Sequence, residues 1–214
     1  YANAIEAIKN YMPAKTETLF LTEEVTEIGD FIGALVNASE LTGGNRAYAD
    51  ANSAHWAYEQ FKTAREYGLV DGLQIKAYDK LTYKAAYFAL YNAILGKGIK
   101  VNENASVFGK TQLNGWDDDD KAMLSALVSV KIIDLNTLAQ IKPTDTVTRG
   151  EAASYVYKLT NAKDANTKPN TKPSKKGCKS TLDGVAAMGS VLPVALTVIG
   201  TALFVTIRKR KIAE

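Results

Sequence analysis

The fold is decided by the stretch Val147-Thr148-Arg149-Gly150-Glu151, which opens a run of apolar residues at helical spacing. Thr148 and Glu151 form a T-x-x-E capping box, in which each side chain accepts a hydrogen bond from the backbone N–H of the other residue. The apolar positions that follow recur every three or four residues, which predicts a helix with one buried face. These positions are Ala152, Ala153, Val156 and Leu159.

The same pattern occurs earlier in the chain. Residues 75–82 and 141–148 both read Ile-Lys-x-x-Asp-x-apolar-Thr, and each unit leads into an alanine-rich helix. A third apolar helix follows Leu21-Thr22, and a shorter helix precedes each of the three. The pattern therefore predicts helix, turn and helix three times over. We expect long helices that start close to Thr22, Thr82 and Thr148, in repeats at approximately 1–40, 46–98 and 111–161.

Three motifs resemble the signature of the S-layer homology (SLH) family: His55-Trp56-Ala57, Gly-Leu-Val-Asp at 68–71, and Thr-Arg-Gly-Glu at 148–151. The resemblance covers roughly residues 1–161. It implies an all-α fold of three helix-turn-helix SLH-type repeats in a pseudo-trimeric arrangement. The first repeat has Thr-Glu-Glu-Val at 22–25, with no arginine, and it lacks its opening portion. We therefore expect the first repeat to be incomplete.

The charges of the chain are segregated. Residues 1–162 carry 16 Lys and Arg against 20 Asp and Glu, a net charge of −4, whereas the whole chain carries +3. A nucleic-acid-binding domain should present a basic face within its folded part, so nucleic acid is not expected as a partner. The lone Cys178 excludes an intrachain disulfide.

The composition changes after residue 161. Residues 162–184 form a polar, Lys- and Pro-containing linker that cannot bury enough apolar surface to fold. Residues 185–207 are uncharged and mostly apolar, long enough to cross a bilayer of about 30 Å. The tail 208–214 begins with four basic residues, which places it in the cytoplasm. We expect a single-pass protein of the cell membrane, with the repeats outside the cell facing the wall. Because the chain begins at Tyr1 without a methionine, we expect that a leader is removed or that a longer protein precedes it.

The sequence offers no recognisable catalytic centre. His55 is the single histidine, and its place at a helix start favours a packing role. A phosphate-binding glycine loop, paired histidine ligands and G-x-S-x-G are all absent from the sequence. The run Asp117–Asp120 could coordinate calcium, but it lacks the spacing of an EF-hand, and acidic residues are favoured at a helix N-terminus. We expect no enzyme activity, no metal and no cofactor. A hydrolase remains an alternative, and it would need a cleft that encloses two carboxylates.

The resemblance points to one principal ligand-binding residue. SLH domains bind secondary cell-wall polysaccharide that carries pyruvate ketals, and the arginine of their T-R-A-E motif is associated with that binding. Arg149 occupies this position, and a guanidinium can form two parallel bonds to a ketal carboxylate. The alternative is a solvated surface arginine in the first helical turn. Lys84 is the matching basic residue of the second repeat, one position later. Trp56 could stack on a sugar, although a tryptophan at a helix start more often packs in the core.

The sequence thus predicts a non-catalytic cell-envelope protein. It would bind an anionic, pyruvylated secondary cell-wall polysaccharide and tether it to the membrane. The alternative is a structural protein–protein scaffold of the cell surface that binds no sugar and contacts other cell-surface proteins.

Overall fold

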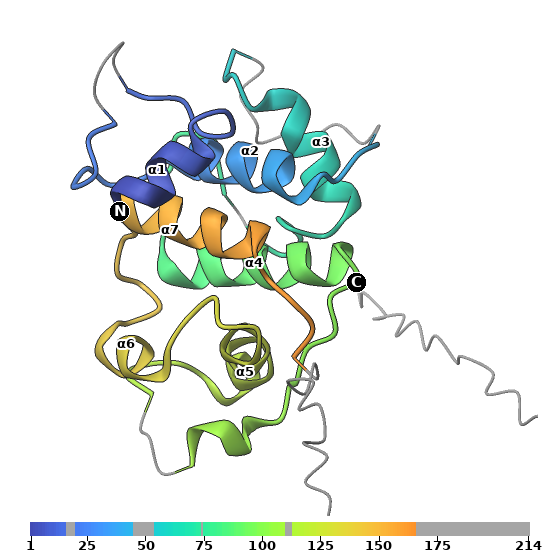
Figure 1. Ribbon diagram of the computed structural model, residues 1–214, viewed down its shortest axis with the longest axis vertical. Helices are drawn as coiled ribbons and strands as arrows, with labels where there is room; N and C mark the ends of the chain where they lie inside the picture. The colour runs from blue at the N-terminus through green and yellow to red at the C-terminus, as the bar shows by residue number, and fades with distance from the viewer. Residues whose placement is uncertain (16–19, 45–53, 74, 110–112, 166–214) are drawn as a thin grey trace, which may run out of the picture. The chain divides into compact units, whose positions relative to one another are not determined.

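The computed structural model in Figure 1 describes residues 1–15, 20–44, 54–73, 75–109 and 113–165. Over these ranges the chain is mostly helical and contains only isolated β-bridges, so the predicted all-α class is confirmed. The helices are α1 (Ala2–Ile8), α2 (Ile28–Ser39), α3 (Tyr58–Glu66), α4 (Tyr83–Gly96), α5 (Lys121–Ser129), α6 (Leu135–Gln140) and α7 (Arg149–Thr160), with short 3-10 turns η1 (Ala105–Phe108) and η2 (Asp118–Asp120).

The three long helices α2, α4 and α7 pack against one another and form the centre of this part of the chain (Figure 1). The shorter helices lie against them: α1 on α7, α3 on α2, and α5 on α4. All residues of α2 except Asn37 are buried. A helix that is buried all round belongs to the interior, so α2 is a core element, packed against α3, α4 and α7.

Two of the three predicted helix starts are confirmed. The Thr148 side chain caps α7 in the predicted capping box with Glu151, and Thr82 caps α4 by accepting from Ala85 N. The turns before them also match, because Asp79 accepts from Lys76 N and Asp145 accepts from Lys142 N. The repeated Ile-Lys-x-x-Asp unit therefore forms the same turn twice.

The prediction that the first long helix starts close to Thr22 is wrong. Helix α2 begins at Ile28, and its N-cap residue Glu27 makes no side-chain cap. The first N–H groups of α2 donate to the segment before α4. Ile28 N donates to Asp79 O at 2.9 Å, and Gly29 N donates to Ala77 O at 2.8 Å. Tertiary contacts thus satisfy these two N–H groups, as they also do at the starts of α4 and α7, and α2 differs from those helices in having no Thr side-chain cap.

The three segments that precede the long helices are joined in a closed ring of backbone hydrogen bonds. Thr26 N donates to Val147 O, Val147 N donates to Leu81 O, and Leu81 N donates to Thr26 O, each at 2.9 Å. The helix starts close a second cycle in the opposite direction: α2 donates to the turn before α4, α4 to the turn before α7, and α7 to residues 22 and 24. The three segments thus occupy equivalent positions, and residues 28, 83 and 149 correspond, as do 30, 85 and 151.

The last segment carries one helix more than the sequence pattern predicts. Helix α6 lies between α5 and α7, and Asp134 caps it by accepting from Thr137 N at 2.8 Å. The predicted linker beyond residue 165, the membrane span at 185–207 and the tail at 208–214 lie outside the described residues. Among the helices of the described ranges, none is long and apolar enough to cross a bilayer.

Candidate functional site

Arg149 is buried, so the alternative of a solvated surface arginine is wrong. The side chain is 0 % exposed although it starts a helix. Its Nε donates to Phe20 O at 2.9 Å, its Nη2 to Pro13 O at 2.6 Å, and its Nη1 to the Asp30 carboxylate at 2.5 Å. The guanidinium also lies over the Phe20 ring. The fork that was expected to hold a ligand carboxylate holds Asp30 and two backbone carbonyls of this chain instead.

Asp30 is the centre of this network. It lies in the first turn of α2, is 4 % exposed, and accepts from Arg149 and Lys15 at Oδ2 and from the Trp56 indole at Oδ1. Burial alone would raise the pKa of Asp30, but the hydrogen bonds from Trp56 and Lys15 and the charges of Lys15 and Arg149 lower it below its usual value. Asp30 is therefore an ionised, fully engaged carboxylate that ties together three parts of the chain.

Trp56 is held by Asp30 but is not a core residue, so the expectation of core packing is wrong. Its Nε1 donates to Asp30 Oδ1 at 2.9 Å, while the residue is 42 % exposed. Its ring lies close to Gly33 of α2, because a Cβ built on that glycine would lie 2.4 Å from Trp56 Cη2. The indole is thus fixed on one edge and open to solvent elsewhere, which makes it a rigid aromatic surface.

Other groups border this aromatic surface. His55 is buried, with its ring 6.0 Å from that of Trp56 and 5.0 Å from that of Tyr78, which is 54 % exposed. Glu27 and Lys15 are half-exposed, and Lys15 Nζ lies 3.2 Å from Glu27 Oε1 and 3.1 Å from Asp30 Oδ2. We call Lys15, Glu27, Trp56 and Tyr78 the aromatic–charged ledge. It combines flat apolar rings with one charge of each sign.

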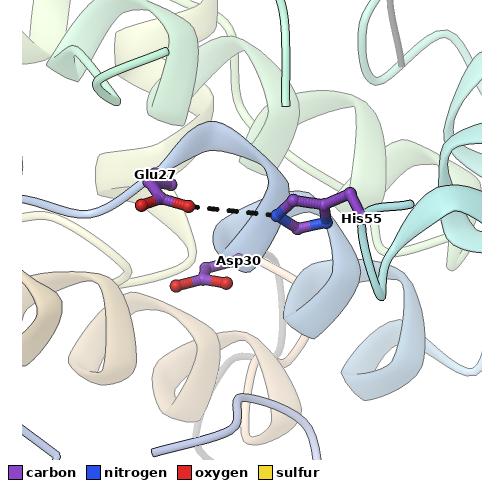
Figure 2. Close-up of side chains that lie close together, drawn as sticks. All are labelled: Glu27, Asp30 and His55. Atoms are coloured by element: carbon purple, nitrogen blue, oxygen red, sulfur yellow. Dashed lines mark ion pairs between the residues drawn. The ribbon is translucent and has the colours of Figure 1, made fainter. Parts of the chain in front are cut away.

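Figure 2 shows Glu27, Asp30 and His55, which the described ranges bring together as a group with metal-ligand atom types. Two observations argue against a metal here. Lys15 already places a cation between the two carboxylates. His55 Nδ1 accepts from Ala57 N at 3.1 Å, so the neutral ring carries its proton on Nε2, the atom that faces Glu27 at 4.0 Å. A metal ligand needs a lone pair on that nitrogen, so these residues fit Lys15 better than a metal ion.

The same carboxylates do not fit the hydrolase alternative. A glycosidase needs a general acid with a raised pKa, whereas the pKa of Asp30 is lowered and its carboxylate is engaged by protein donors. His55 does not supply the acid either, because burial lowers its pKa below the usual value. The contacts of Asp30 therefore hold charged and polar groups in place, and neither Asp30 nor His55 has the raised pKa that a general acid needs.

Lys84 lies at a different place from Arg149 and Trp56. It is half-exposed, and its Nζ lies 3.1 Å from Asp120 and 3.3 Å from Asp117. Asp117 and Asp120 form a capping box around η2, directly before α5, so the acidic run does mark a helix start as expected. The structure therefore brings Arg149 and Trp56 to one site, and it places Lys84 apart with acidic partners of its own.

Lys15, Glu27, Asp30 and Tyr78 belong to the site but were not selected from the sequence. One signal for Asp30 was available, because it is the single charged residue in the apolar run that forms α2. Its partners Lys15, Trp56 and Arg149 are far away in sequence, and no local pattern links them. The chain matches no family model and no curated protein, so the site is argued from its own geometry.

Proposed function

We propose that the chain is a non-catalytic cell-envelope protein that binds an anionic, pyruvylated secondary cell-wall polysaccharide and tethers it to the cell membrane. In this proposal the three equivalent segments are SLH-type repeats in a pseudo-trimer, and residues 185–207 form the single membrane span. The repeats face the wall and the tail lies in the cytoplasm. The closed backbone ring supports the pseudo-trimer, because each segment makes the same bonds to the next.

The observation that carries sugar binding is the fixed, half-exposed indole of Trp56. A sugar ring presents an apolar C–H face and a rim of hydroxyl groups, so a binding site needs a flat apolar surface beside polar donors and acceptors. Trp56 and Tyr78 supply the rings, Lys15 supplies donors and Glu27 supplies acceptors. Because Asp30 holds the indole N–H, the ring loses little freedom when a ligand binds.

Arg149 has a changed role in this proposal. Its buried guanidinium positions Asp30, and Asp30 positions Trp56, so Arg149 acts on the ligand through these residues. Lys84 remains a secondary contact, in which a ligand carboxylate competes with Asp117 and Asp120.

Co-sedimentation of the chain with purified cell walls tests the proposal. Intact walls should retain the protein, and walls stripped chemically of their secondary polymer, or lacking its pyruvyl group, should not. Trp56→Ala should lose most of the retention, whereas Tyr67→Ala, which removes a comparably exposed aromatic ring outside the ledge, should keep it. Equal retention by stripped and intact walls would favour the protein-scaffold alternative.

A further inference from the structure

A second hollow lies away from the aromatic–charged ledge, at the C-terminal ends of α5 and α7. It has a volume of about 400 Å³, within the range of small-ligand sites. Its polar lining comes from Ser129, Lys131, Tyr157, Lys158, Asn161 and Lys163. Three ammonium groups thus surround one cavity in a folded part whose net charge is negative.

Part of this positive charge is explained by the fold. Cations near helix C-termini offset the helix dipole, and Lys158 Nζ donates to Ile132 O at 3.1 Å. Lys131 and Lys163 differ from Lys158, because within the described ranges their side chains form no ion pair or hydrogen bond. The one carboxylate in the lining, Asp164, accepts from Lys100 N at 2.8 Å. The cavity therefore keeps an excess of positive charge that the fold does not use.

Tyr157 gives the cavity a second property. It is 37 % exposed and borders both this cavity and a neighbouring hollow of about 440 Å³ between α1 and α7, which is also lined by Ser154 and Lys158. Tyr157 and Lys158 of α7 therefore belong to the lining of both hollows.

We propose that the cavity at the ends of α5 and α7 binds a sugar acid. The carboxylate lies between Lys131 and Lys163, the sugar ring lies against Tyr157, and Ser129 and Asn161 bond to hydroxyl groups. The choice of a sugar as carrier of the carboxylate rests on the proposed function, in which the ligand is an anionic polysaccharide. The site is separate from the ledge, so one chain can hold such a polymer at two places.

Isothermal titration calorimetry of the 214-residue chain tests this site with three probes: sodium glucuronate, glucose and inorganic phosphate. Glucuronate should bind at least about tenfold more tightly than glucose, because one charge-assisted contact is worth that factor. The double variant Lys131→Gln/Lys163→Gln should weaken glucuronate binding by about tenfold or more. The matched control Lys76→Gln/Lys142→Gln makes the same change in net charge outside the cavity and should leave binding unchanged.

Further variants test whether the cavity recognises a sugar ring as well as a negative charge. Tyr157→Ala should weaken glucuronate binding several-fold, and Tyr157→Phe should retain most of it, because the ring makes the contact. Three outcomes would contradict the proposed site. Phosphate could bind as tightly as glucuronate, the two lysine double variants could lose the same affinity for glucuronate, or glucuronate could fail to bind. If glucuronate binds as described while cell walls do not retain the protein, the proposed function fails and the site stands.

Discussion

The junctions at Arg149 and at Tyr83 occupy equivalent places in the backbone ring but differ in chemistry. At the first, the buried Arg149 guanidinium bonds to Asp30 at the start of α2. At the second, the Tyr83 hydroxyl donates to Glu151 at 2.6 Å, and burial and this hydrogen bond raise the pKa of Tyr83, so it stays a neutral donor. The third equivalent pair, Ile28 and Ala85, is apolar and buried. One backbone scheme thus accommodates an ion pair, a hydroxyl–carboxylate hydrogen bond and an apolar pair.

The two junctions also differ in the groups that surround them. The Arg149 junction is the one that extends to half-exposed charged and aromatic groups, through Asp30 to Lys15 and Trp56. At the Tyr83 junction, Tyr83 is buried, and its ring packs 5.7 Å from that of the buried Tyr87. A buried ion pair adds little net stability compared with apolar residues of the same shape. We therefore interpret the ionic junction as a device for fixing the ledge.

The largest expected effect comes from breaking the ionic junction on one side. Arg149→Ala leaves the Asp30 carboxylate buried with fewer partners, and it removes the donors to Pro13 O and Phe20 O. Loss of one partner of a buried pair costs about 3 kcal/mol or more. Urea unfolding followed by circular dichroism measures this loss. The double variant Arg149→Met/Asp30→Leu should recover much of the stability, and a double variant as unstable as Arg149→Ala would contradict the assignment.

The next largest effect is expected from moving the Trp56 indole of the ledge while the Arg149–Asp30 pair is kept. Gly33→Ala places a Cβ 2.4 Å from Trp56 Cη2 and 2.7 Å from Ala57 Cβ, so the indole must move. We expect a loss of about 1 to 3 kcal/mol from overpacking, together with weaker retention on cell walls. Gly96→Ala is the matched control, since its Cβ would lie 3.1 Å from Tyr67 Cδ1 and away from the ledge. Unchanged wall binding by Gly33→Ala would show that the position of the indole does not matter.

A smaller effect on stability is expected at the junction of Tyr83 and Glu151. Tyr83→Phe removes the hydroxyl that donates to Glu151, but Glu151 is partly exposed and water can replace the lost bond. The cost should be about 1 kcal/mol, measured by the same urea unfolding. Wall binding should not change. A loss as large as that of Arg149→Ala would remove the distinction between the two junctions.

The smallest effect concerns pH. His55 faces Glu27, Asp30 and Lys15, and although the two carboxylates raise its pKa, burial outweighs them and holds the pKa below the usual 6.5. The unfolded chain therefore takes up this proton first, and stability should fall as the pH drops from 6.5 through the folded-state pKa. His55→Asn keeps an acceptor for Ala57 N but does not titrate. Thermal unfolding is measured at about pH 7.5 and about pH 5.5. The unfolding temperature should fall less between these pH values in His55→Asn than in the unmodified protein. An equal fall in both proteins would contradict the role of His55.

The parts of the fold that the sequence predicted are those with local signals. The capping box of Thr148 and Glu151, the Thr82 cap and the two Asp-containing turns are all short-range patterns, and each was confirmed. The start of α2 was missed because its N-cap residue, Glu27, makes no side-chain cap, so no local capping pattern marks it in the sequence. Helix α6 was missed because it is only six residues long and buries one side chain, Leu138.

The site was less predictable than the fold, for a physical reason. A cation in the first turn of a helix is slightly unfavourable, and no local pattern identifies Asp30, 119 residues away, as the partner of Arg149. Trp56 was named from the sequence, but its exposure depends on the missing Cβ of Gly33 and on the Asp30 bond. Such contacts arise only when the three segments meet.

The closed backbone ring has a consequence for how many repeats such a domain can have. A linear array of repeats has two ends, where a unit can be gained or lost while its neighbours keep their contacts. Here Thr26, Leu81 and Val147 each donate to one segment and accept from another, so the ring has no end. Deletion of any segment would leave a buried donor and a buried acceptor unpaired, and a fourth segment would have to open the ring to enter. The copy number is therefore fixed at three, and the segments can diverge in the chemistry of their junctions while the ring is kept.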